Sequence, residues 1–139
     1  MVVLDTNVIS ELSGNSPKLA VLAWAATIPF DELHLCSPVV AELAYGAERQ
    51  FLRTGSQRHR KNLEFIIGER FHGRILPFGT RASEIAGRMR AVRERTGRPV
   101  SAMDMAIAGI AAANNATLAT RNVRDFEGLD LKLINPFEA

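Results

Sequence analysis

The sequence has little cysteine, no long apolar run, and no basic segment before its first apolar residues. Its single cysteine, Cys36, excludes a disulfide within the chain and fits a reducing compartment. We expect Cys36 to be a small buried hydrophobic residue rather than a catalytic thiol. The longest apolar stretch, LAVLAWAATIPF, ends at a proline and is shorter than the roughly 18 residues that a membrane span requires. Without a span or a secretory signal, the chain is predicted to be cytoplasmic and to have no membrane partner.

Histidine is also scarce. His34, His59 and His72 are scattered along the chain, and no histidine or cysteine cluster accompanies the acidic residues. The closely spaced histidine and cysteine ligands that are typical of zinc sites are therefore missing. The chain also has no internal repeat, no low-complexity tract and no linker-like segment. We therefore expect residues 1–139 to form one domain.

The basic residues are concentrated in the middle of the chain. The formal net charge is only +2, but residues 49–98 contain thirteen basic residues against four acidic ones, and the rest contains four against eleven. Of the 17 basic residues 14 are arginine, whose planar guanidinium group suits phosphate. A basic middle beside acidic flanks favours a polyanionic partner. A pair of solvated surface helices would explain the same charge distribution.

Strand and helix patterns alternate along the chain. Short buried-looking strands are predicted at 2–5, 33–37, 74–78, 117–120 and 131–135. Helices are predicted at 6–12, 18–28, 38–51, 56–71, 80–96 and 101–114. This order indicates an α/β fold with a mainly parallel five-stranded sheet flanked by helices. No strand separates the helices at 38–51 and 56–71, so this helical pair is expected to protrude from the sheet.

Polar residues near the helix starts predict four N-caps, at Thr6, Ser37, Thr80 and Ser101. Apolar spacing also predicts which faces of two helices are buried. For the helix at 80–96 these are Ala82, Ile85, Met89 and Val92, and for the helix at 18–28 they are Leu19, Leu22 and Ala26.

Four acidic residues fall where predicted strands end or where the following helices begin. They are Asp5, Glu42, Asp104 and Asp125. In open parallel sheets, binding sites form beyond the carboxyl ends of the strands, so we expect these side chains at one edge. Each acid also has a structural explanation by itself: a strand-end turn for Asp5, a surface position for Glu42, helix capping for Asp104 and turn capping for Asp125.

Four carboxylates at one edge would repel each other unless their pKa values shift or a cation binds them. Oxygen ligands without histidine or cysteine select Mg²⁺ or Mn²⁺ rather than zinc. Such ions suit phosphodiester cleavage, and the arginine-rich middle would hold the backbone of the substrate. One hypothesis thus accounts for both the acidic edge and the basic middle.

Six segments, in order, resemble PIN-domain ribonucleases and more narrowly the VapC-type toxins, including their FitB-like branch. They are VVLDTNVIS, SPVVAELAYG, GRILPF, SAMDMAIAGIAA, LATRNVRDF and GLDLKLINP, which together span nearly the full chain. The resemblance implies a PIN-like fold, an acidic pocket for Mg²⁺ or Mn²⁺, and cleavage of an RNA such as tRNA or rRNA. It also implies a homodimer that is neutralised by a small VapB-type antitoxin, and contact with operator DNA only through that antitoxin.

Carried over by position, the resemblance makes Asp5, Glu42 and Asp104 the catalytic and metal-binding residues. Asp5 and Asp104 would bind the metal directly, and Glu42 would ligate it or orient a metal-bound water. The expected substrate-binding residues are Asn7, Thr120 and Arg121, with Thr6 completing the first motif.

The sequence departs from the family pattern at two positions. Asn122 stands where the family often has an acid, and Asp125 follows three residues later. These two are expected as outer or second-site ligands, which leaves the number of metal ions open. Gly79 also stands where an acid is common, which bears on helix capping rather than on chemistry.

The sequence therefore predicts a metal-dependent endoribonuclease that is the toxin of a type II toxin–antitoxin pair. One alternative is a PIN-like module that binds RNA or an antitoxin with weak or no catalysis. A Mg²⁺-dependent phosphatase is less favoured, because the haloacid-dehalogenase type needs a second aspartate where this chain has Asn7.

Overall fold

A computed structural model describes all 139 residues and contains one five-stranded sheet. Its strands are β1 (Val2–Leu4), β2 (Leu33–Cys36), β3 (Ile75–Leu76), β4 (Thr117–Ala119) and β5 (Lys132–Ile134). The order across the sheet is β3-β2-β1-β4-β5, and every neighbouring pair is parallel. The predicted parallel α/β architecture is confirmed. Each strand is shorter than its predicted segment.

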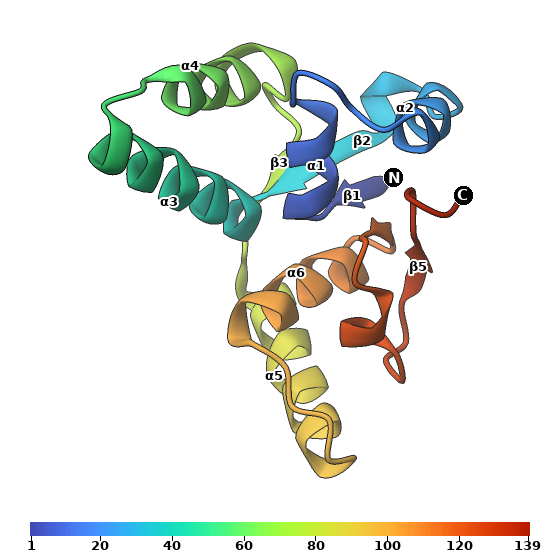
Figure 1. Cartoon of the computed structure of the whole chain (residues 1–139). Helices are drawn as coiled ribbons and strands as arrows, with labels where there is room; N and C mark the ends of the chain where they lie inside the picture. Colours follow the sequence, from blue (N-terminus) through green and yellow to red (C-terminus); the bar gives the residue numbers. More distant parts are fainter.

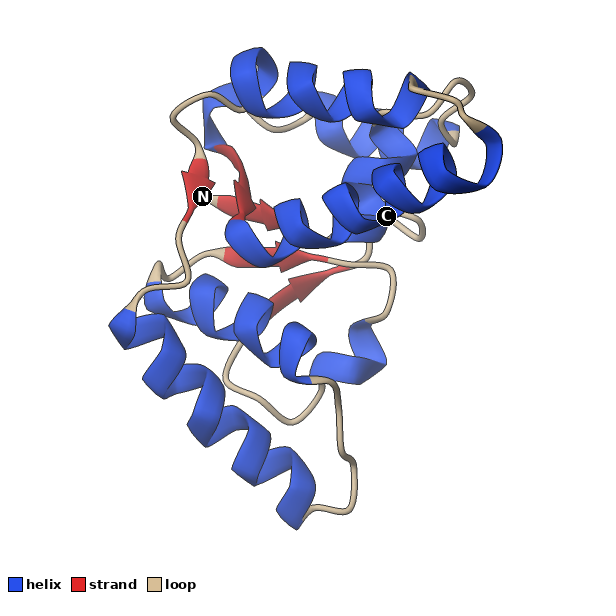
Figure 2. Ribbon diagram, turned by 90° about the vertical axis from the view of Figure 1, so that its left-hand side faces the viewer, coloured by secondary structure: helices blue, strands red, loops and turns tan.

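Six helices flank the sheet. They are α1 (Thr6–Leu12), α2 (Leu19–Ala26), α3 (Ser37–Thr54), α4 (Arg58–Phe65), α5 (Thr80–Arg95) and α6 (Ala102–Ala113). Figure 2 shows the strands between two groups of helices, with α5 and α6 on one side. None of the helices is long and apolar enough to cross a membrane.

The helices α3 and α4 form the predicted protrusion. They extend together away from the sheet at the upper left of Figure 1. The turn between them begins at Gly55, which has the left-handed φ of 75° that ends a helix easily when the residue is glycine. After α4 the chain continues through a π-helical turn, η2 (Ile66–Arg70), before it returns to the sheet at β3.

The hydrophobic core is built around β1, the central strand. Val3 and Leu4 are fully buried in a cluster of 24 residues that also includes Leu35 and Leu118 from the neighbouring strands. A parallel strand that is covered on both faces needs apolar side chains throughout, which explains the run VVL. The first polar residue after this run, Asp5, therefore marks the edge of the sheet.

Three of the four predicted N-caps are displaced by one residue, and only Ser101 is confirmed. The observed caps of α1, α3 and α5 are Asp5, Cys36 and Gly79, and each lies one residue before the predicted residue. Asp5 makes the first of these caps with its own carboxylate, which accepts a hydrogen bond from the Thr6 backbone. The hydroxyl of Thr6 is therefore free for another contact.

The predicted buried faces of two helices are also partly wrong. α5 buries Ala82, Ala86, Met89 and Arg93, while Val92 is 48% exposed. The close approach of α5 to α6 favours the small side chains of Ala82 and Ala86, and this rotates the buried face toward Arg93. In α2 the buried residues are Val21 and Trp24, whereas Leu19 and Leu22 are exposed.

α5 and α6 approach each other most closely at Gly109. A Cβ atom at this position would clash with the Ala82 carbonyl oxygen and would lie 2.9 Å from the Ala86 Cβ atom. We expect Gly109→Ala to lower the free energy of unfolding by about 2–3 kcal/mol, because the two helices must separate. Urea denaturation measures this change.

The matched control is Gly87→Ala in α5. No atom would lie within 4 Å of the added Cβ. In a helix interior alanine is more stable than glycine by roughly 0.5–1 kcal/mol, so this variant should be slightly stabilised. Equal effects of the two substitutions would contradict the close contact at Gly109.

Candidate functional site

Asp5 lies at the carboxyl end of the central strand and is only 6% exposed. Its Oδ1 accepts a hydrogen bond of 2.8 Å from the Thr6 backbone, and its Oδ2 accepts one of 2.7 Å from the Thr120 hydroxyl. Its own backbone N–H donates to the Ala119 carbonyl at the end of β4. These contacts fix the carboxylate between two neighbouring strand ends.

Glu42 reaches the same edge from the second turn of α3. Its Oε1 accepts a hydrogen bond of 2.6 Å from the Thr6 hydroxyl. Thr6 thus connects the two acids, since its backbone contacts Asp5 and its side chain contacts Glu42. The role expected for Thr6 as a helix cap is replaced by this bridging role.

Asp104 lies in the first turn of α6 and is partly buried. Its backbone N–H donates to the Ser101 hydroxyl at 3.0 Å, so the predicted cap at the start of this helix is present. Ala108 and Ala111, further along the same helix, are fully buried. These small residues let α6 approach the sheet closely, which brings Asp104 toward Asp5.

The electrostatics of the acids are coupled. Burial raises the pKa of Asp5, and the charges of Glu42 and Asp125 raise it further, against the lowering effect of the hydrogen bonds from Thr120 and Thr6. Burial also raises the pKa of Asp104, with added repulsion from Asp5 and Asp125. The four acids predicted at this edge therefore act on each other, as expected for carboxylates in one region.

Cys36, at the end of β2, is fully buried. Burial, together with the charges of Asp5 and Glu42, raises the pKa of its thiol to about 12. A thiol that stays protonated is a poor nucleophile. Cys36 is thus a core residue, as the sequence predicted.

The polar residues expected to bind substrate also meet at this edge. Thr120 is fully buried, and its hydroxyl accepts a hydrogen bond from the Asn122 backbone at 3.1 Å. The Asn7 side-chain oxygen accepts a hydrogen bond from the Arg121 backbone at 3.2 Å. These contacts tie the end of β4 to the start of α1, and the role of the three residues in substrate binding stays a prediction.

The acids do not form a ready-made ligand cage. No group of three or more histidine, cysteine, aspartate or glutamate side chains is arranged to hold one metal ion. Glu42 is held by Thr6, and both oxygens of Asp5 accept hydrogen bonds. Each of these carboxylate oxygens keeps a second lone pair beside its hydrogen bond, so the contacts orient the acids and still allow an ion to coordinate them.

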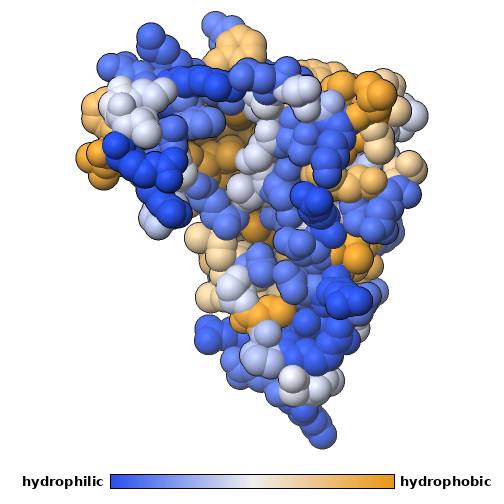
Figure 3. Space-filling model, in the orientation of Figure 1, coloured by the Kyte–Doolittle hydropathy of each residue, from blue (hydrophilic) through white to orange (hydrophobic).

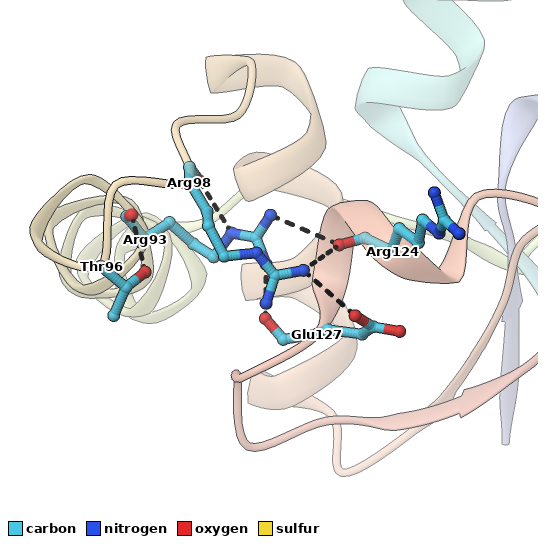
Figure 4. Close-up of polar contacts among 5 residues, drawn as sticks. All are labelled: Arg93, Thr96, Arg98, Arg124 and Glu127. Atoms are coloured by element: carbon cyan, nitrogen blue, oxygen red, sulfur yellow. Dashed lines mark hydrogen bonds and ion pairs between the residues drawn. The ribbon is translucent and has the colours of Figure 1, made fainter.

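A buried arginine holds the short helix that carries Asp125. This helix, η3 (Val123–Phe126), follows β4 directly. Arg93 of α5 is only 4% exposed and donates to the backbone carbonyls of Arg98, Arg124 and Glu127, as Figure 4 shows. No sequence pattern predicted this role, because an arginine in a basic helix gives no sign that it is buried.

Comparison with known proteins gives the family of this chain. The PIN domain model matches residues 2–131. The chain therefore belongs to the PIN domain family. VapC ribonuclease Y4jK of Sinorhizobium fredii is 37% identical over 99% of both chains, and Toxin FitB of Neisseria gonorrhoeae is 34% identical over 99% of both. A solved structure of FitAB bound to an IR36 DNA fragment is 31% identical, covers 99% of this chain and 96% of that chain, and has a TM-score of 0.86.

Membership of the PIN domain family confirms the resemblance that the six ordered sequence segments indicated. The fold likeness to the FitAB structure also extends over the protruding helices α3 and α4, since nearly the whole chain is covered. The acids Asp5, Glu42, Asp104 and Asp125 all lie within residues 2–131, which the PIN domain model matches.

The raised pKa of Asp104 gives a testable effect on stability. A carboxyl group whose pKa is raised in the folded state stabilises the fold at low pH, and this contribution is lost as the pH rises through the raised value. In chelator, Asp104→Asn should therefore have a higher Tm than the wild type at neutral pH, since the amide removes repulsion by Asp5 and Asp125. The difference should shrink below the ordinary pKa of an aspartate. Thermal melts across pH measure this, and a lower Tm for the variant at neutral pH would contradict burial and repulsion as the cause of the raised pKa.

Proposed function

We propose that this PIN domain is a Mg²⁺- or Mn²⁺-dependent endoribonuclease and the toxin of a type II toxin–antitoxin pair. The observation that carries the proposal is the position of Asp5, a buried carboxylate at the carboxyl edge of a parallel sheet. Asp104 and Asp125 lie close enough for the charges of the three acids to repel each other. Keeping such charges together is unfavourable unless protons or a cation neutralise them, and at neutral pH a bound cation does so without removing the charges. The edge is also where ligands bind in open α/β sheets.

The donor set fits a hard divalent cation. Asp5 and Asp104 would hold it directly, and Glu42 would ligate it or orient the attacking water. Asp125 and the amide oxygen of Asn122 would be outer or second-site ligands, and the Asn122 side chain makes no hydrogen bond within the chain. When bound, such an ion neutralises charge on the phosphate and makes water a better nucleophile.

The remaining residues of the site would orient these groups and the substrate. Thr120 and Thr6 direct the carboxylates of Asp5 and Glu42 by hydrogen bonds. Arg121 and Asn7 form the outer part of the same edge, where a phosphate of the RNA backbone would bind. The arginine-rich segment 49–98 would hold further phosphates of the strand.

The partners follow from the same proposal. VapC ribonuclease Y4jK and Toxin FitB are full-length relatives, and their names support RNA cleavage and toxin activity for this chain. The FitAB structure with a DNA fragment supports a small antitoxin of the VapB type as the partner that contacts operator DNA. We also propose a homodimer, a cytoplasmic location, and one nuclease domain over residues 1–139.

The experiment is RNA cleavage by the purified chain with Mg²⁺ or Mn²⁺, with and without EDTA. We expect cleavage that depends on the metal and stops in chelator. Cleavage that continues in EDTA would contradict the metal site, because the proposed chemistry requires a bound cation.

The second candidate function is a PIN-like module that binds RNA or the antitoxin without cutting. It is favoured by one observation, the absence of three acids arranged to hold a single ion. Such a module would hold RNA equally well in chelator and would not arrest growth when expressed. Metal-dependent cleavage would exclude it.

A further inference from the structure

A pocket lies between α1, α3 and α4, beside the acidic edge. Its volume is about 500 Å³. Thr6 and Glu42 line one side, so the pocket reaches the candidate site at the Glu42 carboxylate. Figure 3 shows the molecular face on which the α3–α4 protrusion overhangs the body of the molecule. Apart from Thr6 and Glu42, no residue of the proposed cleavage chemistry lines this space.

The wall at the end of α1 is polar and contains an unpaired buried group. Ser10, Ser13 and Asn15 line it. The Ser13 hydroxyl oxygen is buried and has no hydrogen-bond partner. Buried polar atoms without a partner are rare and destabilising, and a ligand that hydrogen-bonds this hydroxyl would remove the penalty.

The opposite wall is the face of α4 that carries Arg58, His59 and Asn62. None of these three side chains makes a hydrogen bond or an ion pair within the chain. Their neighbour Arg60 is different, because it pairs with Glu48 at 3.2 Å and lies over the Phe51 ring. The side chains of α4 that face the pocket therefore keep their hydrogen-bonding groups free.

We infer that this pocket binds one nucleotide of a single-stranded RNA, next to the phosphodiester bond that is cut. The inference rests on the proposed function, since it places the neighbouring phosphate at the acidic edge. The volume lies within the range of small-ligand pockets, about 300–1,000 Å³. Apolar side chains, Leu43 and Leu63, provide surface for the base.

The chemistry of the wall favours a nucleotide over a peptide. An amide such as that of Asn62 offers a donor and an acceptor together, which matches the edge of an unpaired base. Arg58 supplies a guanidinium group for the next phosphate of the strand. A nucleotide would place one phosphate at Arg58 and, with a cation bound, the other beside Glu42, with the edge of its base against the polar groups between them.

The first test is the cleavage of a short single-stranded RNA of randomised sequence by the full chain. Asn62→Ala and His59→Ala should each raise KM about tenfold, leave kcat nearly unchanged, and alter the base preference beside the cut, since a lost base contact has this size. The controls are Glu64→Ala on the same helix and His72→Ala, which line no part of the pocket and should match the wild type. Wild-type KM and preference in both pocket variants would overturn the inference.

The second test does not depend on cleavage. Nucleoside 5′-monophosphates are titrated into the full chain in EDTA, and NMR shifts of the residues on α1 and α4 are followed. We expect saturable shifts for at least one nucleotide and their loss in Asn62→Ala. If the chain cuts no RNA, these shifts still report on the pocket, so failure of the proposed function is distinguishable from failure of this inference. The absence of shifts in the wild type would overturn the inference. So would an Asn62→Ala variant that loses antitoxin binding but binds RNA as the wild type does.

Discussion

Asp5→Asn is expected to reduce RNA cleavage by about 10²–10³-fold, an effect of the size seen when one group that stabilises a developing charge is removed. Asparagine keeps the shape of the side chain and one oxygen for the Thr6 backbone, but it loses the charge that would hold the cation. The loss should appear in kcat with the chain still folded. Cleavage of a labelled RNA under metal saturation measures it.

The matched control for this variant is Asp31→Asn. Asp31 is exposed and lies in the short helix η1 (Phe30–Glu32), before β2, at the opposite end of the sheet from Asp5. The Asp31→Asn variant should cleave RNA at the wild-type rate. Asp104→Asn should lose activity as Asp5→Asn does, and it leaves the cap of α1 intact. Wild-type cleavage in both site variants would contradict the assignment of the acids.

Metal binding provides a readout that is independent of cleavage. A cation that binds only the folded chain raises Tm as its concentration increases. Mn²⁺ should therefore raise the Tm of the wild type and of Asp31→Asn, but not of Asp5→Asn. Equal shifts in all three proteins would locate the binding elsewhere.

The parallel pairing of the strands and most helices follow from simple patterns in the sequence, whereas the order of the strands across the sheet was not predicted. The run VVL must be buried on both faces, and the alternation with helices specifies parallel pairing. The N-caps were less predictable, because a threonine or serine just after a strand is equally compatible with the cap and with the first helical position. At α1 the acid itself took the cap, which spacing alone does not reveal.

The proximity of the acids was predictable because Asp5 ends a strand and the others lie near the starts of helices, and a parallel sheet brings such positions to one edge. Asp5, Glu42 and Asp104 are brought together in this way. The contact from Thr6 to Glu42 joins residues 36 positions apart and depends on how α3 packs, so no local pattern predicts it. The Ser13 hydroxyl and the pocket between α1, α3 and α4 are equally products of packing.

Arg93→Met is expected to lower the free energy of unfolding by about 3 kcal/mol, because three backbone carbonyls lose their shared donor. Arg93 is buried and pairs with no carboxylate, so its guanidinium group is satisfied only by Arg98, Arg124 and Glu127 (Figure 4). Methionine fills a similar volume without replacing any of these hydrogen bonds. Urea denaturation with far-UV circular dichroism measures the change.

The control is Arg98→Met, on the surface beside it. Arg98 makes an exposed ion pair of 3.1 Å with Glu127, and such pairs contribute about 0.2–1 kcal/mol. Arg93→Lys should be intermediate, since a lysine keeps the charge but cannot reach three acceptors with a planar fork. Two of the three carbonyls lie on either side of Asp125, that of Arg124 directly before it and that of Glu127 two residues after it. Arg93→Met should therefore also weaken the thermal shift by Mn²⁺, whereas Arg98→Met should not. If the two methionine variants were equally stable, Arg93 would not be what holds η3 against α5.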